Sequence, residues 1–184
     1  FQKALQLAAK QQTQCAPNPS VGCLIVDSEG SVLGMGCTQP VGGPHAEIMA
    51  LQNAQSFDGS VVGATAYITL EPCSHHGRTG PCCDALIAAG IKKVVATIAD
   101  PNPLVSGQGF ARLRAAGVEV VVLDPKDPLA IQSRELNIGF FSRMVRKTPW
   151  VRMKIAASLD GKTALDNGVS QWITSPEARN DGHN

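Results

Sequence analysis

The chain has 184 residues, of which 43% are hydrophobic and 17% charged, and its formal net charge is +1. This composition is typical of a soluble globular protein with one sizeable core, and excludes a disordered chain or a coiled coil. The chain has no lysine- or arginine-rich block, so its sequence does not predict a nucleic-acid partner. No apolar run reaches the roughly 20 residues of a membrane span. Six cysteines without a signal peptide predict a reducing, cytoplasmic compartment.

Hydrophobic periodicity predicts alternating helices and strands through residue 147. Apolar residues at helical spacing predict a helix over residues 1–13, and the strands predicted over 21–27 and 31–36 form a hairpin. Further helices are predicted over 45–56, 82–89, 108–116 and 127–147, and further strands over 64–70, 93–99 and 118–123. The helix over 45–56 is expected to bury Ile48, Met49 and Leu51. This alternation indicates a layered α/β domain whose sheet is mixed because of the hairpin.

A second segment begins at Thr148–Pro149. Residues 151–157 are predicted to form a strand, and residues 176–183 the first turns of a helix. A segment of this length cannot build its own core. We therefore expect further sequence after Asn184, and the first residue, Phe1, indicates that residues precede it as well.

Two motifs carry metal-binding side chains, His45–Ala–Glu47 and the stretch from Cys73 to Cys82. Two thiolates and one imidazole are suitable ligands for a catalytic zinc ion, which keeps a fourth position for water. Zinc lowers the pKa of such a water to about 7. Glu47 is then the expected proton shuttle for that water.

Both motifs lie where a helix is predicted to begin. Gly42, Gly43 and Pro44 precede His45, and Pro81 precedes Cys82. In mid-helix, residues i and i+2 point to different faces, whereas in a first turn both side chains can reach a site beyond the helix end. A helix N-terminus also favours thiolate over thiol. The sequence therefore predicts that two helix N-termini converge on one metal ion.

A structural zinc knuckle is the main alternative, because His75, His76 or Cys83 could supply a fourth protein ligand and close the site. We expect Cys83 instead to pack as a small buried hydrophobic residue on the helix that follows.

Two proline-bracketed loops carry polar side chains that could contact a substrate. Asn18 lies between two prolines, and Asp100 and Asn102 follow the strand predicted over 93–99. Open α/β sheets bind ligands at the ends of their strands. Stabilisation of the turns themselves is an equally good interpretation of these residues.

Four longer motifs carry a resemblance to a known family: Pro17–Gly22, Gly43–Glu47, Tyr67–Thr79 and Asp100–Pro103. The short signature of zinc-dependent base deaminases is H-x-E followed by P-C-x-x-C, but here residues 74–81 separate the two cysteines. With this long insert, the sequence resembles the bifunctional riboflavin-biosynthesis deaminase/reductases of the cytidine-deaminase-like superfamily. Lys154, Ser158–Lys162 and Ser170–Ser175 look like the start of that family's reductase domain.

The resemblance implies a three-layer α/β/α cytidine-deaminase-like domain with a mixed central sheet over residues 1–147. Residues 148–184 would be the N-terminal fragment of a dihydrofolate-reductase-like reductase domain. The implied reaction is the hydrolytic deamination of 2,5-diamino-6-ribosylamino-4(3H)-pyrimidinone 5′-phosphate to 5-amino-6-ribosylamino-2,4-pyrimidinedione 5′-phosphate and ammonia. One Zn²⁺ per chain is the implied cofactor.

The resemblance also assigns roles to individual residues. His45, Cys73 and Cys82 would hold zinc, and Glu47 would be the catalytic acid and base. The positions that look like substrate contacts are Asn18, His75, Arg78, Asp100 and Asn102. A guanidinium binds phosphate oxygens in pairs, which suits Arg78 to the substrate phosphate. Gly80, where the family usually has proline, puts the placement of the Arg78 loop in question.

In the second segment, Lys154, Ser170, Thr174 and Arg179 match positions that bind substrate or NADPH in the family's reductase. NADPH would serve only the full-length reductase, so we expect no reductase activity from residues 1–184. A homo-oligomer formed through the missing reductase domain is expected. Two alternatives remain: a deaminase of cytidine, deoxycytidylate, guanine or a tRNA adenosine, and a non-catalytic module whose zinc supports folding.

Overall fold

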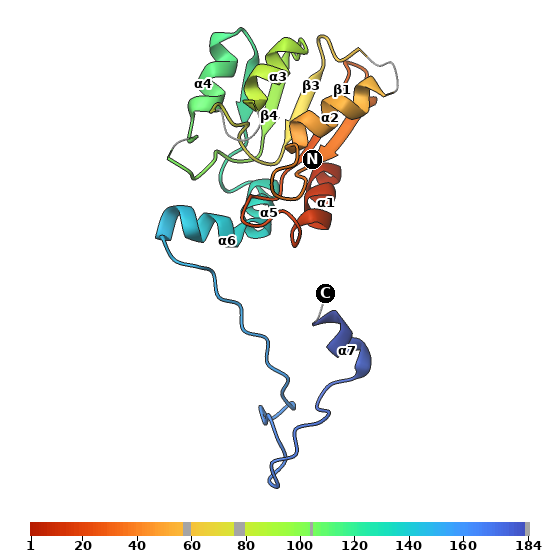
Figure 1. The fold of residues 1–184 in the computed structure, drawn as a ribbon, viewed down its shortest axis with the longest axis vertical. Helices are drawn as coiled ribbons and strands as arrows, with labels where there is room; N and C mark the ends of the chain where they lie inside the picture. Colours follow the sequence, from red (N-terminus) through yellow and green to blue (C-terminus); the bar gives the residue numbers. More distant parts are fainter. Residues whose placement is uncertain (57–59, 76–79, 104, 183–184) are drawn as a thin grey trace. The chain divides into compact units, whose positions relative to one another are not determined.

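The computed structural model describes residues 1–56, 60–75, 80–103 and 105–182 (Figure 1). The chain divides into two compact units, Phe1–Pro149 and Trp150–Asn184. In the described part of the chain, no helix combines the length and the apolar character needed to cross a membrane.

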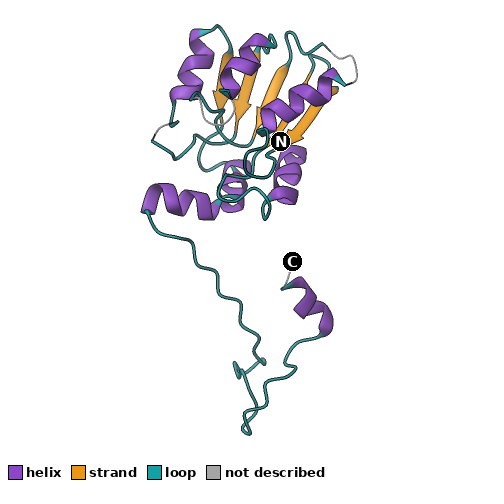
Figure 2. Cartoon of the chain, viewed as in Figure 1, coloured by secondary structure: helices purple, strands orange, loops and turns teal. Residues whose placement is uncertain are grey.

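The first unit is built on a five-stranded sheet with the strand order β2-β1-β3-β4-β5 (Figure 2). Its strands are β1 (Gly22–Val26), β2 (Val32–Cys37), β3 (Thr65–Ile68), β4 (Lys93–Ala96) and β5 (Glu119–Val122). Strand β1 is antiparallel to both β2 and β3, whereas β3, β4 and β5 run parallel. The predicted mixed sheet with an initial hairpin is therefore confirmed.

Helices cover both faces of this sheet. One layer contains α2 (Ala46–Gln55), α3 (Cys82–Ala88) and α4 (Gln108–Ala115), in which α3 contacts both of its neighbours (Figure 1). The other contains α1 (Gln2–Gln11) and α5 (Pro128–Leu136), which contact each other.

Two glycines show that α1 and α2 lie on opposite faces. Gly36 pairs with Cys23, and Gly22 with Cys37, so Gly22 and Gly36 point to opposite sides of the pleat. A Cβ at Gly36 would lie 2.4 Å from the carbonyl oxygen of Ala46 in α2, and one at Gly22 would lie 1.9 Å from that of Ala4 in α1. The predicted three-layer α/β/α arrangement is confirmed.

The close approach of α1 to β1 yields a stability prediction. Gly22→Ala would place a methyl group against helix backbone that cannot move alone, so we expect a loss of about 3 kcal/mol in unfolding free energy. Gly139→Ala is the matched control, because a Cβ at this helical position meets nothing within 4 Å, and alanine should stabilise the helix by up to about 1 kcal/mol. Urea unfolding measures both, and a Gly22→Ala protein as stable as the wild type would contradict the packing described.

The burial of α2 differs from the prediction. Leu51 is buried as expected, but Ile48 and Met49 are only half-buried. The buried face consists mainly of Ala46, Ala50 and Ala54, together with Glu47. Small side chains occupy it because the glycines of β2 bring the helix close to the sheet.

The single helix predicted over 127–147 is interrupted in the structure. Helix α5 is followed by α6 (Ile138–Phe141) and by a π-helical segment, η1 (Ser142–Arg146). At the interruption, the side chain of Asn137 accepts a hydrogen bond from the backbone N–H of Ser20 (2.7 Å) and donates to the Ser20 carbonyl (2.9 Å). An asparagine that bonds backbone in this way competes with a regular helix.

In the second unit, the prediction of a strand over residues 151–157 is wrong. These residues form neither helix nor strand, and Val151, Met153 and Ile155 are 79%, 77% and 58% exposed. Their apolar alternation is that of a strand, but a strand needs a neighbour for its backbone hydrogen bonds, and the described residues of this unit provide none. The predicted helix is present as α7 (Pro176–Asp181), with the Ser175 side chain as its N-cap.

Candidate active site

The predicted metal ligands come from two helix starts and one loop. His45 is the N-cap of α2, Cys82 is the first residue of α3, and Cys73 lies in the loop that follows β3. The Nδ1 atom of His45 lies 3.3 Å from Sγ of Cys82 and 3.6 Å from Sγ of Cys73. The ligand atoms of the three residues all lie within 4.8 Å of one another. This spacing and the set of two sulfurs and one nitrogen fit a zinc ion.

The electrostatics of the cluster favour the metal-binding form of Cys73. Its Sγ atom accepts a hydrogen bond from the backbone N–H of Cys82 (3.3 Å). Interactions with Cys82 and His45 lower the pKa of the Cys73 thiol well below its usual value. A thiolate, and not a thiol, is the form that binds a metal.

Glu47 follows His45 by two residues and lies in the first turn of α2, with only 4% of its surface exposed. Burial raises its pKa to about 7, and the charge of Cys73 acts in the same direction. Because Glu47 lines the same cleft as His45 and Cys73, it can exchange protons with a molecule bound there.

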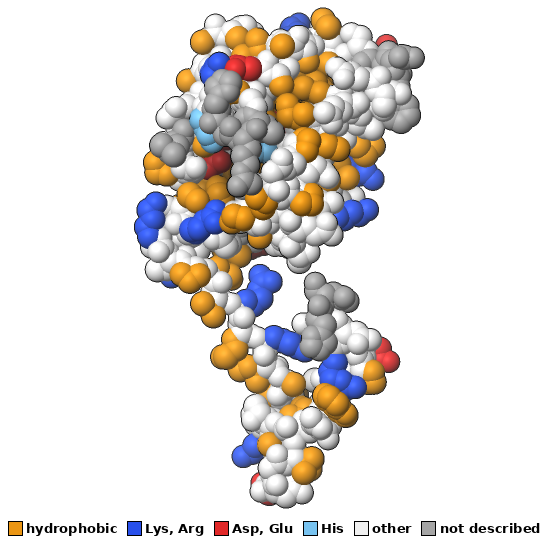
Figure 3. Space-filling model, viewed as in Figure 1, with side chains coloured by type: hydrophobic (Ala, Val, Ile, Leu, Met, Phe, Trp, Pro, Cys, Tyr) orange, Lys and Arg blue, Asp and Glu red, His pale blue; other side chains and the backbone are white. Residues whose placement is uncertain are grey.

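The cleft has a volume of about 430 Å³, within the range of small-molecule sites. The predicted site residues that line it are Asn18, His45, Glu47, Cys73, His75, Asp100 and Asn102. Arg78 and His76 lie outside the described residues. In Figure 3, histidine and acidic atoms lie in a hollow of the first unit, with Lys and Arg side chains nearby.

Asp100 stabilises its own turn and also lines the cleft. Its Oδ1 accepts a hydrogen bond from the backbone N–H of Asn102 (2.7 Å), which is turn stabilisation. The side chain also lines the cleft, where burial raises its pKa to about 6. Contact of Asp100 and Asn102 with a substrate stays a prediction.

Glu71 is a buried carboxylate that sequence reasoning missed. It accepts hydrogen bonds from four backbone N–H groups, those of Asp100 (3.1 Å), Gly107 (2.9 Å), Gly109 (3.0 Å) and Phe110 (3.3 Å). Through these bonds it joins the loop that carries Cys73 to the loop that carries Asp100. The position of Glu71, between the end of a strand and Pro72–Cys73, was the available signal that it lies near the site. Its role could not be predicted, because its hydrogen-bond partners lie 29 to 39 positions further along the chain.

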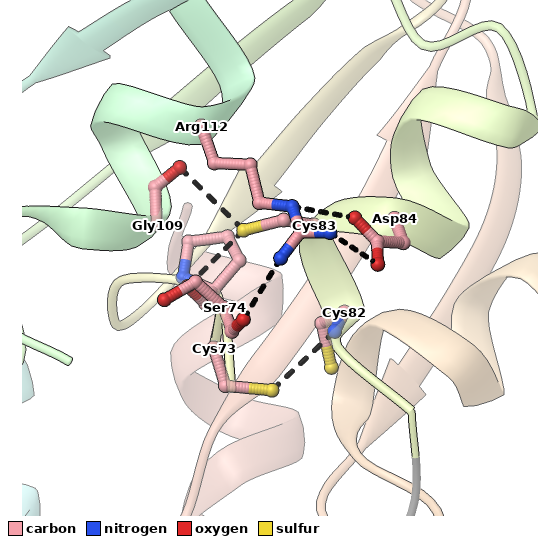
Figure 4. Close-up of polar contacts among 8 residues, drawn as sticks. Cys73, Ser74, Cys82, Cys83, Asp84, Gly109 and Arg112 are labelled. Atoms are coloured by element: carbon pink, nitrogen blue, oxygen red, sulfur yellow. Dashed lines mark hydrogen bonds and ion pairs between the residues drawn. The ribbon is translucent and has the colours of Figure 1, made fainter. Parts of the chain in front are cut away.

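Arg112 connects the two cysteine-bearing segments (Figure 4). Its guanidinium donates to the carbonyl of Ser74 (3.1 Å), next to Cys73, and to both carboxylate oxygens of Asp84 in α3 (2.7 and 2.8 Å). Cys83, buried as predicted, donates its thiol to the Pro72 carbonyl (3.4 Å). The loop that carries Cys73, here called the metal loop, is thus hydrogen-bonded on both sides of Cys73, by Cys83 and by Arg112.

Removal of Arg112 should weaken zinc binding. Groups that orient metal ligands typically contribute 10- to 100-fold to metal affinity, so we expect Arg112→Ala to lower zinc affinity by about 10-fold or more. Arg114→Ala is the matched control on the same helix, because Arg114 donates to Val120 and not to the metal loop. Competition with a chelator measures the affinity. Equal zinc affinity of the two variants would contradict this role.

Residues of α6 and η1 also line the cleft, which sequence reasoning did not predict. Phe140, Arg143 and Met144 contribute to this wall. The sequence gives no signal for them, because they reach the cleft only through the packing of this C-terminal part of the first unit.

The residues predicted for cofactor binding lie in the second unit. The guanidinium of Arg179 donates to the carbonyl of Thr174 and lies 4.2 Å from the ring centroid of Trp172. Lys154 and Ser170 are exposed. Their role in binding NADPH or substrate stays a prediction.

Comparison with known families gives two matches. Residues 1–98 match the family described as cytidine and deoxycytidylate deaminase zinc-binding region, and residues 149–184 match the RibD C-terminal domain. The first match covers His45, Glu47 and Cys73 together with Cys82.

Individual relatives extend this similarity over nearly the whole chain. The riboflavin biosynthesis protein RibD of Escherichia coli is 51% identical over 97% of this chain and 47% of its own length. RibD of Haemophilus influenzae is 49% identical over 98% of this chain and 46% of its own length. The chain therefore spans about half the length of these relatives.

A solved structure is also similar over nearly the whole chain. The diaminohydroxyphosphoribosylaminopyrimidine deaminase/5-amino-6-(5-phosphoribosylamino)uracil reductase of Thermotoga maritima superposes with a TM-score of 0.90 at 40% identity, over 99% of this chain and 50% of that one. The chain thus belongs to the cytidine and deoxycytidylate deaminase zinc-binding family and is a homologue of the riboflavin biosynthesis protein RibD.

Proposed function

We propose that the chain is the zinc-dependent deaminase part of a RibD-type enzyme of riboflavin biosynthesis. Its substrate would be 2,5-diamino-6-ribosylamino-4(3H)-pyrimidinone 5′-phosphate, which loses its 2-amino group as ammonia. The observation that carries the proposal is the gathering of the ligand atoms of His45, Cys73 and Cys82 within 4.8 Å of one another, beside a cleft that His45, Cys73 and the buried Glu47 line. The homology to RibD supports this substrate over other amino-pyrimidines.

In the proposed mechanism, His45, Cys73 and Cys82 hold the metal. Zinc with three protein ligands supplies a Lewis acid and a water molecule whose pKa is about 7. Glu47 accepts a proton from the attacking water and donates it to the ring nitrogen beside the reacting carbon. Glu47 then transfers the second proton of the water to the amino group, the C–N bond breaks, and ammonia leaves.

The other cleft residues would position the substrate. Asn18, His75, Asp100 and Asn102 are proposed to contact it, on the ground that they line the cleft, and Arg78 is proposed for the phosphate by resemblance.

We assign residues 1–147 to the deaminase domain and 148–184 to the beginning of the reductase domain. Lys154, Ser170, Thr174 and Arg179 would bind substrate or NADPH only in the full-length protein, which would form a homo-oligomer through that domain. We further propose a cytoplasmic location and no nucleic-acid or membrane partner, in keeping with the net charge of +1.

Ammonia release from three substrates tests the substrate assignment. The zinc-loaded protein should release ammonia from the diaminopyrimidinone ribotide and not from cytidine or deoxycytidylate. Turnover of a cytosine nucleoside or nucleotide alone would keep the chemistry and overturn the substrate. Release of ammonia from none of them, with zinc bound, would favour the structural zinc module.

A further inference from the structure

Arg143 lies in the π-helical segment η1 and lines the cleft together with Phe140 and Met144. Short π-helical turns are frequent at functional sites. Among the described residues that line the cleft, Arg143 is the single lysine or arginine.

The guanidinium of Arg143 is held in place by two contacts. It donates to the carbonyl of Pro17 (2.7 Å), next to Asn18, and it lies 5.7 Å from the ring centroid of Phe140. A guanidinium carries five N–H donors, and the bond to Pro17 takes up one of them. The contacts therefore orient the group while donors remain for a ligand, which reduces the entropy lost when it binds an anion.

The acidic side chains of the cleft favour a cation beside any anionic ligand. Its described walls include the carboxyl groups of Glu47, Glu71 and Asp100. A cation that binds the phosphate oxygens directly offsets the repulsion between a phosphate dianion and ionised carboxylates nearby. Arginine suits this task because its planar fork binds two phosphate oxygens at once.

We propose that Arg143 binds the 5′-phosphate of the substrate at the wall formed by Pro17 and Phe140. The inference rests on the proposed function, because the phosphate is part of the proposed substrate. It adds a residue that determines specificity for the phosphorylated over the dephosphorylated substrate. Arg78, on the metal loop, would then be at most one of two phosphate ligands.

The test compares Arg143→Ala with the wild type on the ribotide and on the same compound without its phosphate. Loss of a charge-assisted hydrogen bond should raise KM for the ribotide by about 10- to 100-fold and change kcat much less. The loss in kcat/KM for the ribotide should exceed the loss for the riboside by about 10-fold. Arg143→Lys should recover part of the difference, since lysine supplies the charge without the fork.

Arg146→Ala is the matched control, because Arg146 is an exposed arginine of the same segment that is absent from the cleft lining. It should keep the wild-type KM for the ribotide. Equal KM values for Arg143→Ala and Arg146→Ala would overturn the inference. Equal losses on ribotide and riboside would do so as well, because they would indicate a general effect on the cleft.

A binding measurement separates this inference from the proposed function. If the wild type deaminates none of the substrates, the proposed function fails, and inorganic phosphate then serves as the probe for Arg143. Calorimetry on the zinc-loaded protein should show phosphate binding that Arg143→Ala weakens by about 10-fold or more. Phosphate binding of the same strength in both proteins would overturn the role of Arg143.

Discussion

Replacing Glu47 with glutamine is expected to lower kcat for deamination by about 10³-fold or more, while zinc content remains that of the wild type. Glutamine keeps the size of the side chain but cannot accept and return a proton, and general acid–base catalysis contributes typically about 10²- to 10⁴-fold. Glu47 is not one of the three residues whose ligand atoms lie within 4.8 Å of one another. The substitution therefore leaves all three metal ligands in place.

Ammonia release and metal analysis on the same sample measure both parts of this expectation. Glu135→Gln is the matched control, because it makes the same substitution at an exposed position of α5. A Glu47→Gln protein that deaminates at the wild-type rate would show that another group moves the protons.

Replacing Cys73 or Cys82 with alanine is expected to abolish both zinc binding and turnover. Each substitution leaves two protein ligands of the three that a catalytic zinc site uses. Since the loss of groups that merely orient ligands costs about 10- to 100-fold in metal affinity, the loss of a ligand should cost more than about 100-fold. Zinc content after dialysis and chelator competition measure the effect.

Cys83→Ala distinguishes the catalytic site from a closed structural one. The Cys83 thiol donates to the carbonyls of Pro72 and Gly109 and is not one of the three clustered ligands. This variant should therefore keep its zinc and lose only about 1 kcal/mol of stability from its weak hydrogen bonds and packing. Loss of zinc from Cys83→Ala would instead support a closed structural site with four protein ligands, three cysteines and one histidine.

The layered fold and the metal cluster could be predicted because their signals are local. Glycine and proline before His45, and proline before Cys82, indicate helix starts, and the structure begins α2 and α3 at these places. Both helices direct their first turn toward Cys73, so residues distant in the sequence meet at one point.

Other parts of the site could not be predicted because they depend on contacts between remote segments. Glu71 bonds backbone between residues 100 and 110, and Arg112 bonds the metal loop from another helix. Arg143 reaches the cleft through its bond to Pro17, across 126 positions. Such contacts cannot be predicted from the periodicity or spacing of residues within a short stretch of sequence.

The errors in secondary structure have the same origin. Asn137 interrupts the long C-terminal helix because its side chain bonds the backbone of Ser20, 117 positions away. Residues 151–157 have the alternation of a strand, but a strand also requires a neighbour, which the second unit does not offer in its described residues.

The most direct measurement is a titration of the metal-free protein with zinc, in which ammonia release from the diaminopyrimidinone ribotide is followed at each addition. The account predicts that activity is absent without metal, rises in proportion to zinc bound, and stops rising at one zinc per chain. Deamination by the metal-free protein, or full zinc loading without deamination, would contradict it.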